Sequence, residues 1–165
     1  MDTTYKESFQ KLMHLIKKIE FAMLTTVDAD GTLRSRPMAT QSADDFDGDL
    51  WFFTPASSAM VADVEEEHQV NLAYADVGEN TYVSVSGLAR LIRDKAKARE
   101  LWSPAMLAWF PRGVEDPETA LLKVTIEKAE YWDMPGNTLV RLLGFAKAVA
   151  TGERYDPGEN VKLSV

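Results

Sequence analysis

Hydrophobic side chains recur at helical spacing at the start of the chain. Tyr5, Phe9, Leu12, Ile16 and Ile19 are separated by three or four positions in a stretch that is otherwise polar. This spacing places them on one face and predicts an amphipathic helix. Such a helix is expected to cover one end of a barrel.

The segments that follow have the features of short strands joined by turns. Residues 21–27 and 33–40 flank the sequence Asp-Ala-Asp-Gly, which predicts a hairpin. Pro37 lies in the second strand and has no N–H to donate, so this strand is expected at a sheet edge or a bulge. After an acidic turn at 44–49, the apolar run 50–54 is too hydrophobic for a half-exposed strand and predicts a central one.

Capping residues and further apolar runs predict the rest of the architecture. Ser57 and Ser58 can begin a helix that reaches about Glu67, and Asp94 one that reaches Leu101. Strands are expected at 70–75, at 82–86 with a continuation over 88–92, and at 121–132, and a final helix at about 139–150, before a polar tail. Short strands with scattered helices favour an antiparallel barrel over a βαβ sheet.

Composition narrows the class of protein. A chain of 165 residues with 45% hydrophobic content is enough for one domain and too little for two. It contains no Cys, which fits a reducing compartment, and a cytoplasmic location is expected.

The most apolar tract, 139–150, is too short to span a bilayer and is interrupted by Arg141 and Lys147, so no membrane association is expected. The net charge of −8 and the dispersed basic residues predict no nucleic-acid binding.

Several kinds of catalytic site lack their sequence signatures. The chain has two histidines, His14 and His68, in no metal-binding spacing, so no metal site is expected. No nucleophile elbow, Walker A loop or dinucleotide-binding glycine motif is present, which disfavours a serine hydrolase, a P-loop protein or a Rossmann-type dinucleotide-binding protein. Ser84 and Ser86 have no base placed beside them and are interpreted as solvent-facing. No catalytic residue can be named.

Four segments remain that could bind a ligand: 34–41, 51–54, 57–58 and 130–133. Arginine can hold a phosphate, hydroxyl groups and a helix N-terminus add donors, and an amide matches a heterocycle edge. Met and Trp side chains could form the wall beside a flat ring. Together these residues suit a phosphorylated heterocycle. Solvent-facing arginines and ordinary core aromatics explain the same pattern equally well.

Six segments, in order along nearly the whole chain, show a family resemblance. They are Ser35–Met38, Leu50–Thr54, Val70–Tyr74, Tyr82–Gly87, Ala108–Pro111 and Glu130–Asp133. Together they resemble the general stress protein branch of the pyridoxamine 5'-phosphate oxidase-like family. The resemblance implies a mainly β fold, a six- to seven-stranded antiparallel split β-barrel with helical additions, forming one FMN-binding domain over residues 1–165. It also implies a homodimer that holds FMN, a small-molecule ligand, at its interface.

The resemblance also implies which residues bind the cofactor. Arg36 would lie near the phosphate of FMN. The residues expected along the isoalloxazine ring are Pro37, Met38 and Gln41. Those expected on the phosphate and ribityl side are Phe53, Thr54 and Ser58. Trp132, together with Trp109, would approach from the C-terminal aromatic region, from either the same or the other subunit.

The chain departs from its relatives at the phosphate site. Relatives place a lysine in a Ser-x-Lys arrangement, and here Met60 stands in that position after Ser58. Loss of one charge-assisted phosphate contact would cost on the order of 1.5 to 3 kcal/mol, about one to two decades in affinity. Arg34, Arg112 or a backbone donor would have to compensate.

A second departure concerns the reaction. True pyridoxamine phosphate oxidases have an Arg-x-His motif near the C-terminus, and this chain has no histidine after His68. Oxidation of vitamin B6 is therefore not expected. The expectation is an FMN-dependent oxidoreductase of unknown substrate, because the flavin itself can perform the redox chemistry. The alternatives are a non-catalytic flavin carrier or stress-sensing module, and a structural dimer with an eroded site.

Overall fold

The structure, a computed structural model, describes residues 3–41, 47–134, 136–156 and 158–165. Its strands are β1 (Phe21–Val27), β2 (Leu33–Ala39), β3 (Asp49–Pro55), β4 (Gln69–Asp76), β5 (Thr81–Ile92), β6 (Thr119–Asp133) and β7 (Glu159–Ser164). Its helices are α1 (Thr3–Ile19), α2 (Ala59–Glu66), α3 (Lys95–Leu101), the 3-10 helix η1 (Pro104–Ala108) and α4 (Thr138–Thr151).

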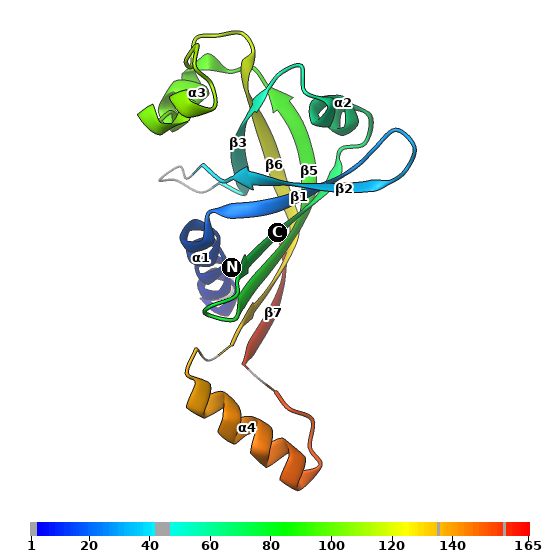
Figure 1. Ribbon diagram of the computed structural model, residues 1–165, viewed down its shortest axis with the longest axis vertical. Coiled ribbons are helices and arrows are strands. Elements are labelled where there is room, and N and C mark those ends of the chain that lie inside the picture. Colours follow the sequence, from blue (N-terminus) through cyan, green and yellow to red (C-terminus); the bar gives the residue numbers. More distant parts are fainter. Residues whose placement is uncertain (1–2, 42–46, 135, 157) are drawn as a thin grey trace.

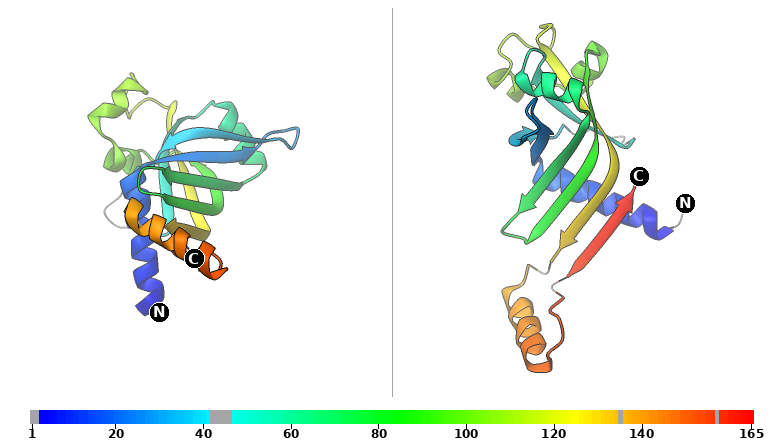
Figure 2. Two further views of the ribbon diagram at one scale, coloured as in Figure 1. Left: turned by 60° about the horizontal axis from the view of Figure 1, so that its bottom comes forward. Right: turned by 90° about the vertical axis from the view of Figure 1, so that its right-hand side faces the viewer.

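All of these strands belong to one antiparallel sheet. Its order is β2-β1-β4-β5-β6-β3, and β7 pairs with the far half of β6. The sheet curls until the chain after β2 meets β3 in a bridge between Gln41 and Trp51 (Figures 1 and 2). The sheet is not closed. The predicted split barrel with helical additions is therefore confirmed, as is the edge position of the strand that contains Pro37.

Two hydrophobic cores lie on opposite sides of β3. The main core packs the inner side of the sheet against α1 and α2, and includes Leu50 and Phe52. A second core packs Trp51 and Phe53 against α3. The prediction of a central strand at 50–54 was wrong, because β3 ends the sheet order. Its side chains are apolar in succession because each face of the strand meets a different core.

Gly87 allows β5 to stay paired with β6 along its whole length. The strand continues over Thr81–Ile92, with an irregularity between Ser86 and Gly87 where the pairing with β6 shifts. A Cβ atom at position 87 would lie 2.3 Å from the carbonyl oxygen of Thr125. The glycine therefore permits a close backbone approach that any larger residue would prevent.

The C-terminal part of the chain differs from the expectation. The final helix is present as α4, but the segment expected to be a polar tail forms β7. Only Val161 and Leu163 are apolar within that strand, so its sequence has a weak periodic signal. Pairing with the end of β6 supplies the backbone partners that the sequence does not reveal. The acidic turn expected at 44–49 lies partly outside the described residues.

Helices α1 and α4 are placed differently relative to the sheet. Leu12, Leu15 and Ile16 of α1 are buried in the main core. Helix α4 has no buried residue and lies at the end of the molecule away from α3 (Figure 1). In the described part of the chain, no helix combines the length and the apolar character needed to cross a membrane.

Substitution of Gly87 tests the close approach of β5 to β6. We expect Gly87→Ala to reduce the free energy of unfolding by about 1 to 3 kcal/mol, because the new methyl group collides with backbone. Gly78→Ala is the control, since a Cβ there meets its nearest atom, an Asp76 side-chain oxygen, at 3.5 Å. Urea unfolding measures both variants, and equal stabilities would contradict the predicted collision.

Candidate functional site

An apolar pocket of about 270 Å³ lies on the outer side of β1 and β2. Phe21 pairs with Ala39 and Met23 with Pro37, so these side chains share one side of the hairpin. The intervening Ala22 is buried on the other side, toward the core. The residues that line the pocket are Phe21, Pro37, Met38, Ala39, Gln41, Phe53, Met106, Trp109 and Phe110.

Aromatic side chains form one wall of this pocket. The ring of Phe53 meets Trp102 edge-on at 5.4 Å and lies 6.0 Å from Phe110. The turn of η1 holds the neighbouring residues in place, because the N–H groups of Trp109 and Phe110 both donate to the carbonyl of Met106. Trp109 is 78% exposed. A large aromatic ring at the rim of a pocket, in contact with solvent, is available to stack on a ligand.

Gln41 lies where the chain leaves β2 and meets β3. Its backbone N–H donates to the carbonyl of Trp51 at 2.8 Å, and its side-chain Nε2 donates to the carbonyl of Ala39 at 3.1 Å. These two bonds fix the amide beside the apolar lining of the pocket. Among the described residues of the lining, Gln41 supplies the side-chain amide, with a second amide hydrogen and a carbonyl oxygen for a ligand.

Arg36 points to the opposite side of β2 from Pro37. It pairs with Leu24, which is fully buried, and its Nη1 donates to Oγ1 of the buried Thr26 at 2.6 Å. Arg36 is not among the described residues that line the pocket, although Met38, two positions along on the same side of β2, is one of them. Because β2 is an edge strand, a ligand lying across its free edge could still contact both sides.

Charges around Arg36 are of both signs. Burial, followed by the nearby positive charge of Arg34, lowers the pKa of Arg36, while the carboxylates of Asp28 and Asp63 raise it. Burial and the Asp28 carboxylate raise the pKa of Asp63 above its usual range. One oxygen of Asp28 is buried without a hydrogen-bond partner among the described residues. Arg36 is thus a partly buried cation. A bound anion would add a favourable charge interaction with its guanidinium, although two carboxylates already lie close by.

Thr54 and Ser58 lie next to each other where β3 leads into α2. Their hydroxyl oxygens are 3.5 Å apart, and Thr54 is buried. The Ser58 hydroxyl accepts from the N–H of Val61 and so caps the helix, as expected from the sequence. Met60 is 8% exposed and belongs to the main core. At the position where the resemblance implies a phosphate-binding lysine, this chain therefore has a core side chain and no charge.

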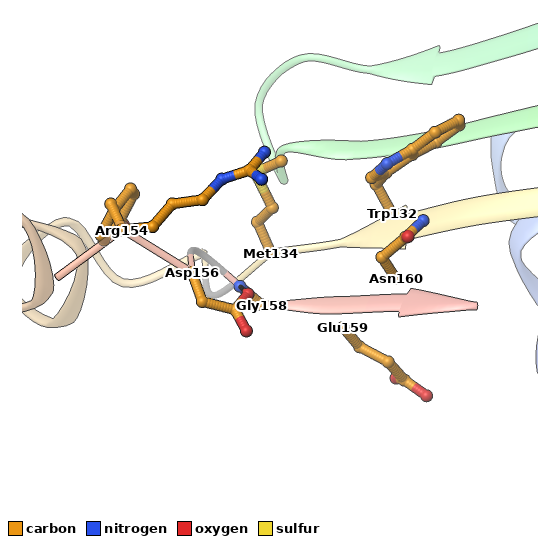
Figure 3. Close-up of a pocket in the computed structure, with 8 residues that line it drawn as sticks. Trp132, Met134, Arg154, Asp156, Gly158, Glu159 and Asn160 are labelled. Carbon is orange, nitrogen blue, oxygen red and sulfur yellow. Dashed lines mark hydrogen bonds between the residues drawn. The ribbon is translucent and has the colours of Figure 1, made fainter.

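Trp132 lies at the other end of the sheet, in a separate pocket of about 580 Å³ between the end of β6, β7 and the segment after α4. Figure 3 shows Trp132 beside Asn160, with Arg154 and Asp156 farther along the same pocket. Phe53 pairs with Leu121 on β6, and from position 121 to position 132 an extended strand covers roughly 35 Å. Trp132 is therefore far from the Phe53 end of the apolar pocket. The Phe21 end is closer to it, because β1 is linked to the end of β6 through the pairings Ala22–Tyr74, Tyr74–Val83 and Val83–Tyr131. Trp132 is not among the described residues that line the apolar pocket.

The structure thus divides the ten predicted site residues into groups. Five of them line one pocket: Pro37, Met38, Gln41, Phe53 and Trp109. Sequence reasoning missed the other lining residues, which are Phe21, Ala39, Met106 and Phe110. The hairpin register could have indicated Phe21 and Ala39, because a pairing that places residue 37 opposite 23 also places 39 opposite 21. Met106 and Phe110 required the packing of η1 against Phe53.

Comparisons with known proteins agree with this fold. Residues 7–156 match the family described as Pyridoxamine 5'-phosphate oxidase like. The chain is 29% identical to Protein bli-3 of Neurospora crassa over 143 residues, which cover 81% of this chain and 68% of that protein.

Solved structures give the same result. The chain is 33% identical to a general stress FMN/FAD binding protein from Xanthomonas citri, with a TM-score of 0.67, over 78% of this chain and 89% of the other. A protein related to general stress protein 26 from Clostridium acetobutylicum is 18% identical, with a TM-score of 0.70, over 100% of this chain and 97% of the other. At that identity the likeness shows the fold alone.

Two aromatic residues of the pocket are expected to differ in their contribution to stability. Phe53→Ala should lower the free energy of unfolding by about 3 to 5 kcal/mol, because it empties the centre of the second core. Trp109→Ala should change it by no more than about 0.5 kcal/mol, since the ring is mostly in solvent. Denaturant unfolding of both variants checks this. A large loss from Trp109→Ala would show that the ring is structural and not free for a ligand.

Proposed function

The chain belongs to the pyridoxamine 5'-phosphate oxidase-like family, and from this premise we propose that it binds FMN and acts as a flavin-dependent oxidoreductase of the general stress protein type. One observation supports the proposal most strongly. Five residues expected from the sequence to contact the cofactor line a single apolar pocket. A relative at 33% identity is named for binding FMN or FAD.

The pocket suits one side of an isoalloxazine ring. The described residues of its lining are apolar and aromatic apart from the Gln41 amide, which can both donate to and accept from the polar edge of the ring. Its volume of about 270 Å³ is below the roughly 300–1,000 Å³ usual for ligand pockets. The described part of one chain therefore encloses only part of a flavin, and we propose that a further wall completes the site.

The phosphate is proposed to lie toward Arg36, across the free edge of β2. A phosphate there would relieve the repulsion between the Arg34 and Arg36 charges and form charge-assisted hydrogen bonds. The hydroxyls of Thr54 and Ser58, at the N-terminus of α2, would add donors on that side. Since Met60 contributes no charge, we expect weaker binding than in relatives with the lysine, by about one to two decades.

A homodimer is the proposed source of the missing wall. In one chain Trp132 lines a separate pocket and not the apolar one, so we propose that the Trp132 that contacts the flavin comes from a second chain. A symmetric pair would then contain two equivalent sites. Within the proposal, the second subunit supplies Trp132, which is a point that the sequence left open.

When bound, the flavin would supply hydride or electron transfer. The protein's part would be to hold the ring between apolar side chains, to orient its polar edge with Gln41, and to exclude water from one face. None of the described residues that line the pocket is titratable. Any proton that accompanies the reaction would therefore exchange with solvent or with the substrate.

This lack of titratable groups also supports a second candidate function. A pocket without an acid or a base would equally suit a non-catalytic flavin carrier or a stress-sensing module. The two functions differ in turnover: a carrier binds flavin but does not pass electrons from a nicotinamide donor to an acceptor.

The absorption spectrum of the purified protein tests flavin binding and reduction. We expect a flavin spectrum, either as purified or after addition of FMN, that bleaches under anaerobic conditions with NADH or NADPH. Bound flavin that no tested reductant bleaches would favour the carrier. A colourless protein that fails to take up added FMN would overturn both functions.

Arg36→Gln tests the placement of the phosphate. We expect FMN affinity to fall roughly tenfold to a hundredfold, because a charge-assisted contact is lost. Riboflavin has no phosphate, so its affinity should be nearly unchanged, whereas Trp109→Ala should weaken both ligands. The matched control is Arg90→Gln, which removes an exposed arginine from β5. Titration by flavin fluorescence measures all three variants, and equal losses for FMN and riboflavin in Arg36→Gln would refute the placement.

A further inference from the structure

A loop between η1 and β6 contacts both sides of the proposed flavin site, and we call its residues 110–118 the bridging loop. Phe110, at its start, lines the apolar pocket. Glu118, at its end, accepts hydrogen bonds from the N–H of Ser57 at 2.7 Å and from the Ser57 hydroxyl. Ser57 directly precedes Ser58, which caps α2 on the proposed phosphate side. The bridging loop therefore connects the ring side of the site to its phosphate side.

The bridging loop has no regular element to fix its shape. Residues 110–118, all of which the structure describes, form neither helix nor strand. The N–H of Gly113 donates to the carbonyl of Phe110 at 2.9 Å and closes one turn. Arg99 of α3 forms an ion pair with Glu115, but these side chains are 56% and 62% exposed, and ion pairs in solvent contribute little. The middle of the loop is therefore fixed by another group.

Lys95 anchors the middle of the bridging loop and the start of β6. Its Nζ donates to the carbonyls of Val114, Asp116 and Thr119 at 2.8, 2.7 and 2.8 Å. An ammonium group has three N–H donors, so all of them are used. Hydrogen bonds from a charged donor are stronger than those between neutral groups. The three carbonyls thus surround a cation that belongs to the protein itself.

Helix α3 gives this ammonium a fixed position. Lys95 is the first residue of α3, which Asp94 caps by accepting from the N–H of Lys97 at 3.1 Å. Ala98 and Leu101 of the same helix are buried in the second core. Figure 1 shows α3 beside the chain that leads into β6. Because α3 is packed on the core, the bridging loop takes its position from that core through Lys95.

We propose that Lys95 is a positioning residue for flavin binding, because its ammonium holds the bridging loop in the conformation that places Phe110 and Ser57. This role rests on the proposed function. Lys95 is not among the described residues that line the apolar pocket, so it acts through the loop and not by contact with the ligand. Without the ammonium, three half-buried carbonyls lose their partner, and the loop has to change shape to bring them to water.

This role predicts a pattern of ligand binding that differs from that of Arg36. Arg36 is proposed to act on the phosphate alone, whereas the bridging loop contacts the ring side as well. Removal of the Lys95 ammonium is therefore expected to weaken the binding of riboflavin, which has no phosphate, as well as the binding of FMN.

Chemical rescue tests the role of the ammonium. Lys95→Ala should weaken both FMN and riboflavin roughly tenfold in a fluorescence titration, because the pocket wall and the start of α2 are no longer held in place. Alanine leaves room for a free ammonium ion among the three carbonyls. Ammonium chloride should therefore restore part of the lost affinity, whereas tetramethylammonium chloride at the same ionic strength should not, because its cation has no N–H donor.

The matched control is Lys97→Ala, which removes the same charge two positions along α3, where Nζ donates to Glu100 at 2.9 Å. This variant should keep the wild-type affinities in both salts. Equal affinities in Lys95→Ala and Lys97→Ala, or a loss in Lys95→Ala that both salts or neither restores, would overturn the role of Lys95 alone. A wild-type chain that binds neither flavin would overturn the proposed function as well.

Hydrogen exchange followed by NMR tests the anchor without flavin, in a variant that keeps a long side chain. Lys95→Met has no N–H donor, and we expect the amides of Gly113, Thr119 and Ser57 to exchange at least about tenfold faster than in the wild type. The reason is that movement of the bridging loop breaks the bonds these amides make. Unchanged exchange at Ser57, or an equal acceleration at Leu72 in β4, would overturn the proposal.

Discussion

The pairing of β6 with three other strands is the constraint on which the rest of the structure depends. Its first half pairs with β3, most of its length with β5, and its far end with β7. A single strand of 15 residues therefore joins the pocket end of the molecule to the end that contains Trp132 and α4. Along this strand, positions 121 and 132 are roughly 35 Å apart, while the curled sheet links the Phe21 side of the pocket to the same end of β6 through β4 and β5. Trp132 and the apolar pocket remain two separate sites in one chain, which is why the proposed site uses a second chain.

The edge position of β2 determines how a ligand can be held. Pro37 faces outward to the apolar pocket, whereas Arg36 faces inward to Thr26. In a central strand these two sides would be separated by neighbouring backbone, but at an edge one ligand can contact both. Strand β2 separates the apolar groups of the proposed site from its charged groups. Apolar and aromatic side chains surround the proposed ring, and the charged groups are confined to the other side of the strand.

The sequence predicted much of the fold because the spacing of apolar residues within a segment indicates whether that segment forms a helix or a strand. Period-two and helical spacing located the helices and most strands, and the caps at Ser58 and Asp94 are both present. The missed strand β7 has few apolar residues and exists through pairing with the end of β6. The apolar run of β3 was assigned to the middle of the sheet because a sequence cannot show that a strand lies between two separate cores.

For the candidate site, the sequence by itself determined which residue types are available: an arginine, an amide, hydroxyls and aromatics in an order that resembles one family. Only the tertiary structure decided which of them meet. It gathered Pro37, Met38, Gln41, Phe53 and Trp109, turned Arg36 to the other side of its strand, and buried Met60 in the core. It also left the large apolar side chains of α4 exposed to solvent. The reason is physical: composition and spacing specify what each residue can do, whereas distance between residues far apart in the chain is set by strand pairing and packing.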